Sequence, residues 1–223
     1  LWGIGLSTII PTTLYNTNLE LGYSHTSNEI NNQPADGDID IYNVALASNV
    51  LNTRTRRATV RVGLEAKDSE STIATISQED KVRKVYVSGN YIHRGFDSVW
   101  YAAMRVSKGV DILDSSQLGD PMVTRAQGDP EAVIAQPDLY INWRPFEYGE
   151  FRFNASGQWA SNALLSADLF AIGGYGTVRG FQVAQVTGES GYHASLEYLH
   201  DIPVNQDFIV GFGPWVDAGA VHN

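Results

Sequence analysis

The chain of 223 residues contains no cysteine, which excludes disulfides, cysteine-ligated metal sites and a cysteine nucleophile. Basic residues are also few: 15 Lys and Arg stand against 25 Asp and Glu, and the net charge of -10 argues against a nucleic-acid-binding protein. No run of about 18 apolar residues occurs, so no transmembrane helix is predicted. Membrane-spanning β-strands remain possible, because each needs only about 10 alternating residues.

Apolar and polar residues alternate along about ten segments, as expected for strands with one apolar and one polar face. In residues 58–65, for example, Ala58, Val60, Val62 and Leu64 alternate with Thr59, Arg61, Gly63 and Glu65. Comparable segments lie at 2–10, 19–24, 42–46, 85–91, 100–107, 139–144, 151–159, 192–198 and 210–217. No helix is predicted, so the chain is expected to be all-β.

The lengths of the segments and of their connections favour a transmembrane antiparallel β-barrel. Alternating runs at 17–28, 56–68, 83–96 and 149–161 exceed the strands of about 5 or 6 residues that are usual in soluble proteins. Short connections are predicted at 11–16, 52–55, 97–98, 147–149 and 201–206, and long ones at 29–39, 69–82, 109–135 and 162–189. Such alternation is typical of outer-membrane barrels. A soluble β-sandwich or β-solenoid is the alternative.

One long connection contains a glycine-rich segment, residues 170–181, with Gly173, Gly174, Gly176 and Gly180 around Arg179. It is not a phosphate-binding loop, because its glycine spacing differs, no helix follows, and no Lys-Ser/Thr completes it. Five apolar residues predict that the segment packs against other parts of the protein: Phe170, Ile172, Tyr175, Val178 and Phe181.

Arg179 would need a carboxylate partner if this loop packs inside a barrel. The two following strands offer Glu197 and Asp217 on their polar faces, the latter together with Trp215 and several glycines. A solvated arginine on an exposed loop is the alternative interpretation.

Catalytic and metal-binding signals are weak, and neither a catalytic residue nor a metal or other cofactor is predicted. His193, Ser195 and Glu197 lie on one strand face, but steps of about 6.5–7 Å are too long for a hydrogen-bonded relay. The polar faces of other strands carry Arg61, Arg105, Arg144 and Arg152 together with Glu20, Glu65 and Glu150. These charges fit either ordinary lumen polarity or a channel for an extended polypeptide.

Residues 164–181 and 187–198 resemble the TpsB transporters of two-partner secretion, the haemolysin and filamentous-haemagglutinin secretion proteins, whose superfamily includes the BAM-complex insertase. The hallmark Val-Arg-Gly-Phe tetrapeptide is Val178 to Phe181. The second motif, Gly-x-x-x-Phe-x-Asp, reads here from Gly211 to Asp217, with Trp215 in place of Phe.

The resemblance implies specific roles for these residues. Arg179 would pair with Asp217, and Glu197 matches a further acidic position. The functional loop would comprise Gly173, Gly174, Val178, Arg179, Gly180 and Phe181, and the barrel wall that anchors it would comprise Asp217, Glu197 and Trp215.

The resemblance implies a barrel of 16 strands. Residues 1–223 are therefore expected to be one incomplete barrel domain, about strands 4 to 13, with the loop at 162–189 and without POTRA domains or barrel ends.

The function implied is an outer-membrane pore of a Gram-negative bacterium that exports a TpsA-like exoprotein. Expected partners are this exoprotein and outer-membrane lipid or lipopolysaccharide, with no nucleic acid, and the pore is expected to be monomeric. The alternatives are an insertase of the same superfamily and, more remotely, an enzymatic barrel that would use His193 and Ser195.

Overall fold

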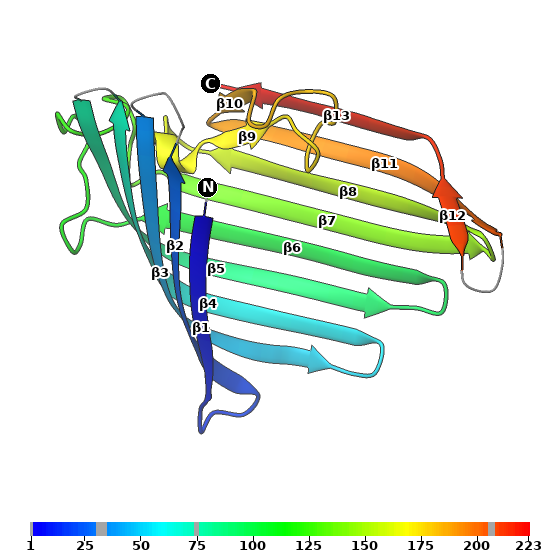
Figure 1. Cartoon of the computed structure of the whole chain (residues 1–223). Coiled ribbons are helices and arrows are strands. Elements are labelled where there is room, and N and C mark those ends of the chain that lie inside the picture. Colours follow the sequence, from blue (N-terminus) through cyan, green and yellow to red (C-terminus); the bar gives the residue numbers. More distant parts are fainter. Residues whose placement is uncertain (1, 30–34, 74–75, 205–207) are drawn as a thin grey trace.

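The computed structural model describes residues 2–29, 35–73, 76–204 and 208–223. In these residues it contains thirteen strands and one short 3-10 helix, η1 (Figure 1). The strands are β1 (Trp2–Pro11), β2 (Thr17–Glu29), β3 (Ala35–Asn52), β4 (Arg56–Ile73), β5 (Ile76–Arg94), β6 (Ser98–Gly109), β7 (Val133–Phe146), β8 (Gly149–Ala160), β9 (Phe170–Ile172), β10 (Val186–Gly188), β11 (Ser190–Pro203), β12 (Ile209–Phe212) and β13 (Trp215–His222), and η1 is Ser166–Asp168. Within these residues no helix has the length and apolar character needed to span a bilayer.

Eleven strands form one antiparallel sheet in which β1 to β8 follow in chain order and β11 pairs with β8. Both β12 and β13 pair with the other edge of β11, in a single register: His200 lies opposite Phe212, and Glu197 lies opposite Trp215. They therefore form one strand interrupted at Gly213 and Pro214, where the proline has no N–H for the ladder. The predicted ten strands, eight before the glycine-rich loop and two after it, are confirmed.

The sheet curls strongly, and the loop between β8 and β11 lies within the curl (Figure 1). This loop contacts β4 through Lys67 and β13 through Asp217, strands that only curvature can bring to one segment. The polar strand faces are therefore concave. Apolar side chains such as Val62, Leu64 and Val87 project from the convex face, each more than half exposed. All-β architecture with one apolar and one polar face, as predicted, is that of a barrel wall.

Buried apolar side chains gather only where loops cover the concave face, among the residues that the structure describes. One cluster joins Val82, Val123 and Leu165, and a second joins Ala132, Ile134 and Leu164. The hydrophobic core of this part of the chain is thus made by loops packing on the sheet.

Two predicted long loops are wrong. Most of 29–39 and 69–82 belongs to strands. β2 and β3 pair as far as Glu29 with Asp36, and β4 and β5 pair as far as Ile73 with Ile76. Residues 30–34 and 74–75 lie outside the described part. The polar composition of these segments suggested loops, but ladder hydrogen bonds join backbone groups, so polar strands can extend beyond an apolar belt. The connections at 110–132 and 161–189 are long, as predicted, although the second contains η1, β9 and β10.

Candidate functional site

The connection from Ser161 to Glu189, here called the inserted loop, has a stem and a tip. The stem is a small antiparallel ladder in which Phe170 lies opposite Gly188 and Ile172 opposite Val186. The tip, residues 173–185, closes this ladder and carries Arg179. Because the stem is a hydrogen-bonded ladder, it holds the two ends of the tip together.

Glycines shape the tip. Gly173 and Gly174 have φ of 116° and 94°, and Gly180 has φ of 89°, values that residues with a Cβ rarely adopt. A Cβ on Gly173 would also lie 2.2 Å from the carbonyl oxygen of Gln182. The Gly173 N–H donates a hydrogen bond to Thr177 Oγ1 at 2.8 Å, which closes the turn. Together these features present Arg179 toward the sheet.

Arg179 is bound to Asp217 of β13 by three hydrogen bonds. Its Nε and backbone N–H donate to Asp217 Oδ2 at 2.8 and 2.9 Å, and its Nη2 donates to Oδ1 at 2.8 Å. Nη2 also donates to Ser195 Oγ at 3.0 Å, and Nη1 lies 3.7 Å from Glu197 Oε2. The guanidinium carbon lies 4.1 Å from the centre of the Trp215 ring. The hydrogen bonds to Asp217 raise the pKa of Arg179 above its ordinary value, although burial opposes this.

The register of β11 and β13 explains why these groups meet. Ser195 lies opposite Asp217 and Glu197 lies opposite Trp215, so all four side chains share one patch of the concave face. The Asp217 side chain is 2% exposed and that of Arg179 is 15% exposed. The structure thus brings together Arg179, Asp217, Glu197 and Trp215, and it adds Ser195, which the sequence suggested only for catalysis.

Close packing accompanies the polar contacts. A Cβ on Gly219 would lie 3.2 Å from Val178 Cγ2, and a Cβ on Gly191 would lie 2.7 Å from Phe170 Cδ1. The absence of side chains at these positions lets the loop lie directly on β11 and β13.

Only part of the predicted apolar packing of the loop is found. Ile172 is buried, and Phe170 and Val178 are partly buried. Tyr175 is 89% exposed and Phe181 is 57% exposed, so the prediction was wrong for them. Both lie in the tip, in which Val178 and Arg179 face β13.

The groups considered for catalysis are engaged in other contacts. His193 is buried with its ring stacked on Phe170, the centroids 6.1 Å apart. Ser195 binds Arg179. Across the described ranges, no group of three or more His, Asp or Glu has the arrangement of a metal site.

The four strand arginines noted in the sequence, Arg61, Arg105, Arg144 and Arg152, contact carboxylates. Arg61 Nε lies 2.9 Å from Glu20 Oε2, and Arg105 Nη2 lies 2.7 Å from Glu65 Oε2. Both Arg144 and Arg152 form ion pairs with the buried Glu150. The concave face is therefore lined with paired charges.

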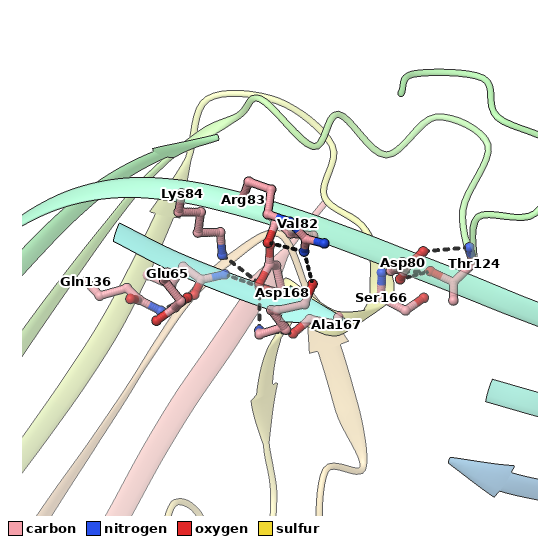
Figure 2. A network of polar contacts seen from close by, with 12 residues as sticks. Glu65, Asp80, Val82, Arg83, Lys84, Thr124, Gln136, Ser166, Ala167 and Asp168 are labelled. Atoms are coloured by element: carbon pink, nitrogen blue, oxygen red, sulfur yellow. Dashed lines mark hydrogen bonds and ion pairs between the residues drawn. The ribbon is translucent and has the colours of Figure 1, made fainter. Parts of the chain in front are cut away.

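Sequence reasoning missed Asp168, which lies at the base of the inserted loop. Its Oδ1 contacts Lys67 of β4 at 2.8 Å. The same oxygen contacts Lys84 of β5 at 2.7 Å (Figure 2). The alternation places Lys67 on the same polar strand face as Glu65, but nothing local to Asp168 indicates partners about a hundred residues away.

The family model of the haemolysin secretion/activation proteins ShlB/FhaC/HecB matches residues 5–223. The chain belongs to this family. The resemblance seen in the sequence is therefore confirmed.

Solved structures support the barrel fold. CdiB from Escherichia coli is similar with a TM-score of 0.72 at 14% identity, covering 91% of this chain and 39% of that one. CdiB from Acinetobacter baumannii has a TM-score of 0.72 at 18% identity, covering 99% of this chain and 40% of that one. A comparison with curated protein sequences finds no match. The chain spans about two fifths of the length of these two structures.

Proposed function

We propose that this chain forms part of the wall of an outer-membrane pore that exports a large exoprotein, in extended form, from a Gram-negative bacterium. Membership of a secretion family supports export. An apolar convex face and a charged concave face suit a wall between lipid and a watery passage. In this proposal residues 1–223 are one incomplete barrel domain, about strands 4 to 13, and POTRA domains elsewhere in the protein capture the exoprotein.

The observation that carries the proposal is the contact of Arg179 with Asp217. It fixes a loop inside the curl of the sheet, where an exported chain would pass. We assign the turn to Gly173, Gly174 and Gly180, with Val178 and Phe181 flanking Arg179 as the rest of the functional tetrapeptide. The wall receives the loop through Asp217, Glu197 and Trp215. No nucleotide or other cofactor enters the proposed mechanism.

The test is the secretion of the cognate exoprotein by the full-length protein carrying Arg179→Ala. We expect secretion to fall by about tenfold or more while the amount of folded barrel in the outer membrane is unchanged. Arg54→Ala is the matched control, because Arg54 is exposed in the turn between β3 and β4, and it should secrete normally. Normal secretion by a stably inserted Arg179→Ala protein would refute the role of the loop.

Family membership favours secretion over the insertase alternative. Depletion of the protein should therefore stop the export of one exoprotein, whereas loss of an insertase would deplete many outer-membrane proteins together. The proposed surroundings of the convex face are outer-membrane lipid and lipopolysaccharide, around a monomeric pore.

A further inference from the structure

A second charged cluster lies at the base of the inserted loop, apart from Arg179. The carboxylate of Asp168, which lies beside Lys84 in Figure 2, contacts both Lys67 and Lys84 through one oxygen. Lys67 Nζ also donates to the carbonyl oxygen of Ala167 at 2.9 Å. The three side chains are only 7%, 15% and 8% exposed, respectively. Two strands of the wall thus meet one residue of the loop in a buried ion cluster.

The wall alone leaves these lysines short of negative charge. Glu65, which lies opposite Lys84, forms an ion pair with Arg105 at 2.7 Å. Buried ammonium groups without a carboxylate are costly, and removing one partner of a buried pair is strongly destabilising. Asp168 therefore supplies a charge that the wall needs, and it does so only when the loop is in place.

Further hydrogen bonds join the two ends of the inserted loop at this base. Gln158 Nε2 of β8 donates to the carbonyl oxygens of Asp168 and Glu189, at 2.9 and 3.0 Å. Arg125 donates to the carbonyl oxygen of Leu164 and to Glu189 Oε1, both at 2.7 Å. The start and the end of the loop are thereby held together.

The connection between β6 and β7 links the base of the inserted loop to β5. Asp80 accepts hydrogen bonds from the N–H and the hydroxyl of Thr124, at 2.9 and 2.6 Å. Thr124 Oγ1 in turn accepts from the Ser166 N–H at 3.0 Å (Figure 2). Leu165 packs beside these contacts with Val82 and Val123. The base is therefore fixed in place before the stem begins.

From these contacts we infer that Asp168 is a positioning residue that acts through the stem to set the place of Arg179. The stem ladder begins at Phe170, two residues after Asp168, and leads directly to the tip. The tip contacts β11 and β13 through Arg179, whereas Tyr175 and Phe181 are exposed. Because Lys67 and Lys84 hold the base of the loop, the stem restricts Arg179 to positions near Asp217. The consequence for secretion rests on the proposed function, whereas the placement of Arg179 does not.

The experiment measures the docking of the tip directly. Residues 1–223 contain no cysteine, so Val178→Cys introduces the only thiol in this part of the protein, at a position that faces Gly219 of β13. Any cysteine elsewhere in the full-length protein is replaced by serine. A polyethylene-glycol maleimide should react with this thiol only when the tip leaves the wall, and it should do so slowly in the full-length protein inserted in outer membranes. Adding Asp168→Asn should raise the rate about tenfold or more, and Asp168→Glu should restore slow reaction.

The double variant Lys67→Met, Lys84→Met removes the partners of Asp168 on β4 and β5. It should also raise the rate of maleimide modification. Folding of each barrel is checked by its heat-dependent shift on gels. A rate within about twofold of the parent in either folded variant overturns the inference. Fast modification with Asp168→Asn supports it, and normal secretion by that same variant, without Val178→Cys, would count against the proposed function alone.

Discussion

Arg179→Ala should release the loop tip by an amount that the contacts allow us to rank. The change removes two side-chain hydrogen bonds to Asp217, one to Ser195 and the contact with the Trp215 ring, while the backbone N–H bond to Asp217 remains. Removing one partner of a buried ion pair costs about 3–5 kcal/mol. The Arg179 side chain retains 15% exposure, so we take the lower end, about 3 kcal/mol, which is a factor of about 150.

The rate at which a polyethylene-glycol maleimide modifies Val178→Cys measures this factor. Ser195→Ala removes one hydrogen bond worth about 1 kcal/mol and should raise the rate about fivefold. Trp215→Ala removes a cation–π contact of about 0.5–2 kcal/mol and should raise the rate about two- to thirtyfold, less than Arg179→Ala does. Arg54→Ala should leave the rate unchanged.

Asp217→Ala provides the pairwise test. Because Arg179 and Asp217 share one contact, combining their alanine substitutions should cost less than the sum of the two single changes. Equal rates for Arg179→Ala and Ser195→Ala, or strict additivity of Arg179→Ala with Asp217→Ala, would refute the view that the ion pair holds the tip.

Three further predictions concern other contacts. Gly219→Val should raise the mobility of a spin label at Tyr175→Cys, because a Cβ there would already lie 3.2 Å from Val178 Cγ2 and 3.0 Å from the carbonyl oxygen of Tyr192, and Gly89→Ala, at a site with open space, is its control. Burial raises the pKa of Asp168, but Lys67 and Lys84 lower it further, to below its ordinary value; this stabilisation is fully present above about pH 4 and is lost as the pH falls through the lower folded-state pKa. A spin label at Tyr175→Cys should therefore keep constant mobility from about pH 8 to 5 and gain mobility only below about pH 4, and an increase near pH 6 would contradict the assignment. Val62→Arg on the convex face should reduce barrel assembly, with a cost of about 2–4 kcal/mol if the position lies at mid-membrane, whereas Val62→Leu should assemble normally in a heat-shift gel assay.

Strand alternation predicted most of the fold because it reports which side of the sheet each residue faces. The same parity placed Asp217 and Glu197 on one face, and the family motif selected Asp217, whose atoms the structure brings to Arg179. The functional roles of these residues stay predictions.

Alternation could not reveal the ends of the strands or the base of the loop. Near Glu70 of β4, which lies opposite Asp38 of β3, the residues of β4 are polar on both faces, so the pattern fades there although the ladder continues. Asp168 meets Lys67 and Lys84 only after the sheet has curled and the loop has folded into it. Contacts of this kind depend on three-dimensional closure, which a pattern with a period of two residues does not encode.

The residue at position 219 determines how closely the inserted loop approaches β13. Because Gly219 has no side chain, Val178 packs close to the backbone of β13. At this distance the side chain of Arg179 reaches Asp217 at 2.8 Å. One additional methyl group on β13 would press against Val178 and force the loop tip to shift by a few tenths of an ångström. The exchange of a single small residue in β13 could therefore adjust how firmly the loop is held while every charged group stays in place.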